Sequence, residues 1–80
     1  MATKQWSVRS TSDMGRAIAE IRRSKDLTQV ELATQAGMSR DTLAQLETGR
    51  SGRTLDQLLR LLRRMGATVT ITLGNDDGQA

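Results

Sequence analysis

The stretch LTQVELATQAGMSRDTLAQLETGR, residues 27–50, contains the signals that decide the fold. Thr28 and Glu31 have the spacing of a capping box, in which a hydroxyl and a carboxylate each satisfy a free backbone N–H at a helix start. Gly37 suits the left-handed conformation that ends many helices, and Ser39 can cap a following helix. The stretch therefore predicts two short helices joined by a tight turn, which sets them at a steep angle.

Helical periodicity also precedes this stretch. Ala17, Ile18 and Ile21 recur on one face, which predicts a first helix with an apolar side. Ser12 or Thr11 can cap that helix with its hydroxyl.

A fourth helix is predicted after a glycine-containing loop. Thr54 and Gln57 again have the spacing of a capping box, and Gly66 ends the helical pattern. The leucines that form a stripe wide enough to close the core are Leu55, Leu58, Leu59 and Leu62. Leu61 lies off this stripe, beside Gln57 and Met65, so we expect it at the surface.

Residues 67–73, ATVTITL, alternate between threonine and apolar residues, which predicts a strand with one apolar face. A single strand cannot satisfy its own backbone groups, so it needs a partner. Two partners are open: the segment from Lys4 to Arg9 of the same chain, or the same strand of a second copy in an antiparallel ribbon. We favour the second copy, which predicts a homodimer. Its dimerisation residues would be Leu61, Val69, Ile71 and Leu73.

These elements predict one small domain with flanking segments. Trp6 and Val8 alternate with polar residues near the N-terminus, as either a short strand or an ordered arm. The predicted boundaries are an N-terminal arm at 1–11, a helical domain at 12–66, a dimerisation strand at 67–73 and a disordered polar tail at 74–80.

The composition weighs against several functions. The chain of 80 residues has no Cys and no His, so it lacks disulfides, thiolate metal sites and the commonest general base. It also lacks a phosphate-binding glycine loop and paired carboxylates on one helix face, so we expect no enzyme, no cofactor and no metal site. Its apolar runs are too short for a membrane span or a signal peptide, and the absence of Cys fits a cytoplasmic location.

The net charge is +3, and it is higher when the tail is set aside. Without Asp76 and Asp77, residues 1–73 carry 12 basic and 7 acidic side chains. A basic small domain leans towards nucleic acid, although ordinary solubility charge explains the excess equally well.

The helix predicted from residue 40 to about residue 47 has an outward face suited to reading DNA. Leu43 and Leu46 must face inward on this helix. The side chains that then point outward are Arg40, Asp41, Ala44 and Gln45. Arginine can bond guanine with two hydrogen bonds, glutamine can bond adenine, aspartate can accept from cytosine, and alanine can touch a thymine methyl. Taken singly, these side chains are ordinary solvated groups, and the capped helix pair is what favours base reading.

The two helices resemble the helix-turn-helix of the Cro and phage-repressor (XRE) family over residues 13–65. The matching positions are Thr28-Gln29, Glu31-Leu32-Ala33, Gly37, Ser39, Leu43 and Glu47-x-Gly49-Arg50. The resemblance implies a mainly α, four-helix, lambda-repressor-like DNA-binding domain followed by one C-terminal strand. It also implies sequence-specific transcription regulation, with base reading by the outward residues named above. Asp41 departs from the common Gln or Lys of the family.

The resemblance assigns supporting roles as well. Helix N-termini offer backbone amides to phosphates. The expected phosphate contacts are Gln29, Ser39, Thr42, Arg50 and Arg53. Arg22 and Glu47 stand where several phage repressors have an ion pair, which would brace the first helix against the end of the third.

The layout from residue 54 to residue 73 is similar to that of HipB-type antitoxins, in which a helix and one strand follow the helix-turn-helix. That similarity implies a homodimeric repressor that binds a palindromic operator of its own toxin-antitoxin operon. It also implies a HipA-like kinase toxin as a partner. Two alternatives stay open: an XRE-type regulator without a toxin, and an antitoxin that acts mainly by binding protein.

Overall fold

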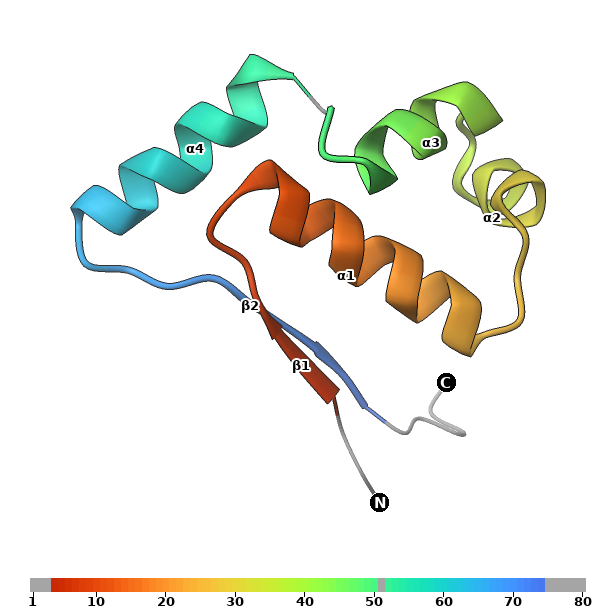
Figure 1. The fold of residues 1–80 in the computed structure, drawn as a ribbon, viewed down its shortest axis with the longest axis horizontal. Coiled ribbons are helices and arrows are strands. Elements are labelled where there is room, and N and C mark those ends of the chain that lie inside the picture. The colour runs from red at the N-terminus through yellow and green to blue at the C-terminus, as the bar shows by residue number, and fades with distance from the viewer. Residues whose placement is uncertain (1–3, 51, 75–80) are drawn as a thin grey trace.

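A computed structural model describes residues 4–50 and 52–74 of the chain (Figure 1). The elements follow in the order β1 (Lys4–Ser7), α1 (Thr11–Ser24), α2 (Gln29–Ala36), α3 (Arg40–Glu47), α4 (Arg53–Arg64) and β2 (Thr70–Leu73). The predicted mainly helical fold is confirmed. The tail predicted at 74–80 lies outside the described residues except for Gly74.

The helix α1 begins one residue earlier than the sequence indicates. Ser10 is the capping residue, since its hydroxyl oxygen accepts a hydrogen bond of 3.1 Å from the backbone N–H of Asp13. The prediction that Thr11 or Ser12 caps this helix is therefore wrong. Thr11 instead donates its hydroxyl to the carbonyl of Gly49 at 2.9 Å, which ties the start of α1 to the loop after α3.

The helices α2 and α3 form as predicted. Thr28 and Glu31 make both bonds of the capping box, at 3.0 Å and 2.8 Å. Gly37 has a φ of 74°, a conformation that a side chain would strain, and it turns the chain between the two helices. Ser39 then caps α3.

The start of α4 differs from its prediction. Gly52 is the capping residue and no side chain caps the helix, so the expected capping box of Thr54 and Gln57 is wrong. Arg53 is already helical, which makes Thr54 the second residue of the helix, whereas a capping residue needs extended backbone. The helix ends at Arg64, just before the turn at Gly66.

The two strands pair with each other in an antiparallel sheet, with Trp6 opposite Ile71 (Figure 1). Val8 extends the pairing, because its N–H donates to the carbonyl of Val69 at 2.9 Å. The sequence analysis favoured a second copy as the partner of the strand at residues 67–73. This prediction is wrong for one edge of β2, because the chain's own N-terminal segment occupies that edge. That segment is a strand as far as Ser7, and residues 1–3 lie outside the described residues.

Small side chains make the core thin. The buried apolar residues are Val8, Ala17, Ala19, Ala33, Leu43 and Leu59. On α4 only Leu59 is buried, while Leu58, which was expected in the core stripe, is 49% exposed. Periodicity shows which leucines share a face, but the sector of that face that turns inward depends on how α4 lies against α1.

Candidate nucleic-acid interface

The outward side of α3 carries side chains that are free of partners within the described part of the chain. Arg40, Asp41 and Gln45 are exposed, and none of their side chains makes a hydrogen bond to another described residue. Ala44 is half-buried beside them, whereas Leu43 on the opposite side is 3% exposed. The helix therefore presents hydrogen-bonding groups to solvent and anchors itself by its apolar side.

The start of α3 is polar and ordered by two hydroxyls. Ser39 accepts from the backbone N–H of Thr42 at 3.0 Å and donates its own hydroxyl to Thr42 Oγ1 at 2.9 Å. Both residues were expected to contact phosphate. They lie together at the helix start, where the free N–H groups and the helix dipole favour an anion.

Gln29, another expected phosphate contact, is engaged inside the molecule. Its side-chain amide donates to Glu47 Oε1 at 2.9 Å, which joins the start of α2 to the end of α3. The side chain is half-buried. In this geometry Gln29 fixes the relative position of the two helices.

Arg22 and Glu47 form a two-bond ion pair between α1 and the end of α3. Arg22 Nε lies 2.7 Å from Glu47 Oε2, and Arg22 Nη2 lies 3.1 Å from Glu47 Oε1. Arg22 Nη1 also donates to the carbonyl of Leu27 at 2.9 Å, so one guanidinium holds the loop before α2 as well. The two side chains are only 12% and 6% exposed.

The pair changes the proton affinity of both partners. The hydrogen bonds from Arg22 lower the pKa of Glu47, although burial opposes this, and Gln29 lowers it further. The hydrogen bond to Glu47 likewise raises the pKa of Arg22. Both groups therefore stay charged, as a partly buried ion pair requires.

A close approach between α1 and α3 completes the support, and the sequence analysis did not identify it. A Cβ atom on Gly15 would lie 2.3 Å from the carbonyl oxygen of Leu46 and 2.6 Å from that of Glu47. Only glycine allows this contact, because both neighbours are backbone atoms. The signal was a glycine inside an otherwise helical pattern, which often marks a packing reason.

The remaining expected contacts are both exposed: Arg50 lies in the loop after α3, and Arg53 is the first residue of α4. The backbone N–H of Arg50 donates to the carbonyl of Gln45 at 2.8 Å, which holds the chain close to the end of α3. Two further arginines are therefore available along the edge that leads from α3 to α4.

The comparison with family models decides the classification. A model described as a helix-turn-helix domain matches residues 13–70. The chain belongs to the helix-turn-helix domain family. This match covers α1 from Asp13 onward, all of α2 to α4 and the first residue of β2. Membership of this family indicates a DNA-binding regulator. No curated protein and no solved structure matched the chain.

Two further properties concern the described residues only. None of their helices has the length and apolar character needed to cross a membrane. Their Asp and Glu side chains form no group of three or more that could hold a metal ion.

Proposed function

We propose that this helix-turn-helix protein reads a specific DNA sequence with α3 in the major groove and thereby regulates transcription. The observation that carries the proposal is the pattern on α3: Arg40, Asp41 and Gln45 are exposed and unpaired, while the end of the helix is fixed by Glu47. A reading helix needs such donors and acceptors on a rigid support, because base contacts depend on exact placement.

The proposed roles follow side-chain chemistry. Arg40 would bond guanine, Gln45 adenine and Asp41 the amino group of cytosine, with Ala44 close enough for a thymine methyl. The phosphate contacts proposed around this helix are Gln29, Ser39, Thr42, Arg50 and Arg53. Gln29 can serve two purposes, since its Nε2 bonds Glu47 and its side-chain oxygen has no partner among the described hydrogen bonds.

We also propose that the regulator works as a homodimer on a palindromic operator. The bond from Val8 to Val69 fixes the hydrogen-bonding phase of the sheet. Because bonded and non-bonded pairs alternate along an antiparallel ladder, Ile71 bonds towards β1, while Thr72 directs its N–H and C=O to the outer edge of β2. That outer edge can pair with the same edge of a second copy. Two reading helices would then meet half-sites about 34 Å apart.

The proposed dimerisation residues therefore divide into two groups. Val69, Ile71 and Leu73 lie in or beside β2, and Thr72 joins them as the residue whose backbone faces outward. Leu61 lies on α4 and is 55% exposed. Its exposed apolar neighbours on α4, Leu58 and Met65, point to a different role.

The test of DNA reading is selection of duplexes from a randomised pool by the purified chain, followed by competition with unselected duplex. We expect a common motif and specific binding that is at least about a thousandfold tighter than binding to unselected DNA. Arg40→Ala should weaken binding to the selected duplex about tenfold or more. Arg16→Ala is the matched control, because Arg16 is also exposed but lies on α1. Recovery of no motif would overturn the proposal.

The layout after the reading helix supports a narrower proposal, an autoregulating repressor that is the cytoplasmic antitoxin of a HipA-like kinase toxin. The pairing of β2 with β1 departs from the shared lid expected of HipB-type antitoxins, so this proposal rests on the order of elements. Co-expression with a kinase-like protein encoded beside this chain tests it. A stable complex supports the antitoxin role, and a neighbouring gene of another kind favours an XRE-type regulator without a toxin.

A further inference from the structure

Charge is divided unevenly between the two parts of the molecule. Residues 10–50, which hold α1, α2 and α3, contain six basic and six acidic side chains. Residues 4–9 and 52–74, which hold the sheet and α4, contain six basic and one acidic side chain. The whole excess of positive charge on the described residues therefore belongs to the part that does not contain the reading helix.

The helix α4 in that part carries an exposed apolar ridge. Leu58, Leu61 and Met65 are 49%, 55% and 66% exposed. Their spacing places them on one face of the helix, one turn apart. Among the described residues, the other large apolar side chain with such exposure is Val30 on α2. Clustered exposed apolar side chains of this kind mark an interaction surface, whereas a single one is ordinary.

Arginines run along one side of the ridge. Arg53, Arg60 and Arg64 recur at helical spacing and are exposed, and Arg64 lies one turn from Leu61. Arg60 contacts Asp56 at 2.7 Å, and Asp56 is the one acidic residue of this helix. A partner on the ridge would therefore meet positive charge along its flank.

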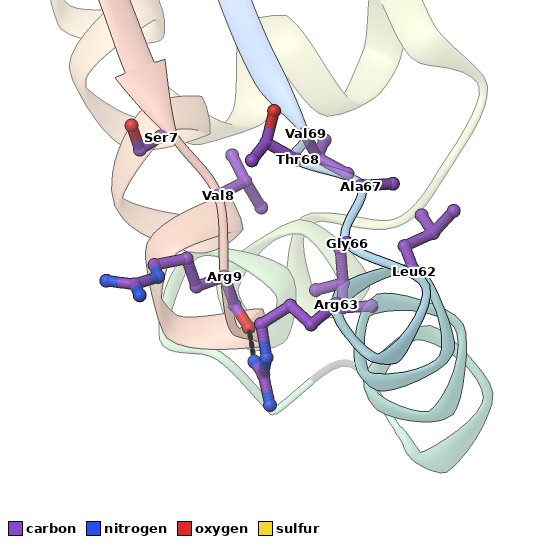
Figure 2. A pocket seen from close by; sticks show the side chains of 10 residues that line it. Ser7, Val8, Arg9, Leu62, Arg63, Gly66, Ala67, Thr68 and Val69 are labelled. Atoms are coloured by element: carbon purple, nitrogen blue, oxygen red, sulfur yellow. Dashed lines mark hydrogen bonds between the residues drawn. The ribbon is translucent and has the colours of Figure 1, made fainter.

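A hollow of about 410 Å³ adjoins the other side of the ridge. Its apolar walls come from the end of α4, the connection to β2 and the residue after β1: Val8, Leu59, Leu62, Ala67 and Val69. Leu62 neighbours the ridge on the helix, so the apolar surface continues from the ridge into the hollow. At the rim, the guanidinium of Arg63 donates to the carbonyl of Arg9 (Figure 2).

We propose that the α4 face, defined as Leu58, Leu61, Leu62, Met65 and Arg64, docks an acidic amphipathic helix of another protein. The apolar row of that helix would cover the ridge and enter the hollow. Its glutamates or aspartates would face the row of arginines on one flank and Arg63 at the rim of the hollow on the other. Charge complementarity selects this occupant. A second copy would oppose one α4 that carries four arginines and one aspartate to another, and DNA would gain nothing from an apolar ridge.

The position of the face has a consequence for regulation. In Figure 1 the helix α4 lies on the left of the molecule, whereas α2 and α3 lie on the right. A partner that covers α4 therefore leaves Arg40, Asp41 and Gln45 on α3 open to DNA. The inference does not require that α3 reads DNA, so the two proposals fail separately.

A synthetic peptide tests the inference directly. The probe is a fluorescent helical peptide with leucines at i, i+3, i+4 and i+7 and glutamates on both flanks, and its binding to the full chain is measured by anisotropy. We expect micromolar affinity that weakens as salt rises from about 0.05 to 0.5 M, because the flanking contacts are exposed and ionic. A peptide with lysines in place of the glutamates should bind at least about tenfold more weakly.

Variants locate the binding surface. Leu61→Ser and Arg64→Glu should each weaken binding of the acidic peptide about tenfold, since each removes an apolar or charged contact at the centre of the face. Val30→Ser and Arg16→Glu are the matched controls, being an exposed apolar residue on α2 and an exposed arginine on α1. Circular dichroism melts of all four variants show that the fold is retained, as expected for exposed positions.

Three results would overturn the inference. The first is no binding of the acidic peptide at high micromolar concentration, or equal weakening by the control variants. The second is a dimer in sedimentation equilibrium that Leu61→Ser dissociates, because a second copy would then cover the face. The third is displacement of the peptide by unselected duplex DNA in amide chemical-shift experiments on the α4 residues.

Discussion

At the scale of single residues, Glu47 joins three parts of the domain. It accepts hydrogen bonds from Arg22 on α1 and from Gln29 on α2, and it is itself the last residue of α3. Arg22 adds the loop before α2 through the carbonyl of Leu27. The family resemblance implies the pairing of Arg22 with Glu47, whereas the bond from Gln29 follows only from the angle between α2 and α3.

Removing the charge of Glu47 should therefore destabilise the domain strongly. In Glu47→Gln, Arg22 would remain as a nearly buried charge without a carboxylate, which costs about 3 kcal/mol of the free energy of unfolding. Urea denaturation followed by the fluorescence of Trp6 measures this loss, since Trp6 is the single tryptophan and its indole N–H bonds Glu20 at 3.0 Å. The exposed pair gives the control: Asp56→Asn should cost less than about 1 kcal/mol. Equal losses in the two variants would contradict a special role for Glu47.

The same pair predicts a pH dependence of stability. The pKa of Glu47 is lowered in the folded state by the hydrogen bonds from Arg22. Its contribution is therefore fully present above the unfolded pKa of about 4.3, and it is lost as the pH falls through the lower folded value. The difference in unfolding free energy between wild type and Glu47→Gln should be constant near neutral pH and should shrink in acid. A difference that grows as the pH falls would contradict this sign.

Gly15 is the second residue whose identity the fold dictates. Gly15→Ala would raise helix propensity by about 1 kcal/mol, yet its Cβ would meet the carbonyl oxygens of Leu46 and Glu47. We expect a net destabilisation of about 2 kcal/mol, because backbone atoms must move to relieve the overlap. Gly74→Ala is the control, since nothing lies within 4 Å of a Cβ there. Thermal melts of both variants measure the effect, and a stabilised Gly15→Ala would show that α1 and α3 are not in close contact.

At the scale of secondary-structure elements, the capping signals were the most predictive part of the sequence. The capping box at Thr28, the left-handed turn at Gly37 and the cap at Ser39 depend on neighbouring residues only, and all three are confirmed. Thr54 and Gln57 have the same spacing, but they form no capping box. The local pattern cannot reveal that the helix already begins at Arg53.

Pairing of strands was less predictable, because it depends on residues far apart in the chain. The alternation in residues 67–73 indicates a strand but does not identify its partner. The segment Lys4–Ser7 is short and mostly polar, so its own signal is weak. Trp6 stabilises its pairing, since Trp6 lies half-buried opposite Ile71 of β2 and donates its indole N–H to Glu20 of α1.

The phase of the sheet makes the dimer proposal testable by two prolines. Thr72→Pro removes an N–H at the outer edge of β2, so it should convert a dimer to a monomer and leave the fold intact. Ile71→Pro removes an N–H that bonds β1, so it should destabilise the chain itself. Sedimentation equilibrium gives the mass, and thermal melts give the stability. A Thr72→Pro variant that stays dimeric would contradict pairing at this edge.

At the scale of the whole molecule, the excess positive charge and the exposed apolar side chains lie elsewhere than the sequence suggested. The net positive charge was interpreted as a sign of DNA binding, but residues 10–50 are neutral overall and the excess lies on α4 and the sheet. The apolar stripe of α4 was expected to face the core, but Leu58 of that stripe is 49% exposed and only Leu59 is buried. Composition and periodicity do not show where charged side chains gather on the folded molecule or which face of α4 is exposed. Both depend on how the elements pack.

The molecule therefore has two separate surfaces, one on α3 and one on α4. The helix α3 presents exposed hydrogen-bonding groups over a braced support, and α4 presents an apolar ridge with arginines. The first surface is proposed for DNA and the second for a protein. Such a division lets DNA affinity be measured without the protein partner.

The central claim is that α3 reads bases, and a base-by-base affinity profile tests it most directly. The measurement compares wild type with Gln45→Ala on every single-base variant of the selected duplex. If α3 reads bases, Gln45→Ala should lose its preference at one base pair of each half-site, worth about 1–3 kcal/mol, and keep the preferences at all other positions. A variant whose profile matches that of wild type, or which weakens equally on every sequence, would show that Gln45 on α3 does not read a base.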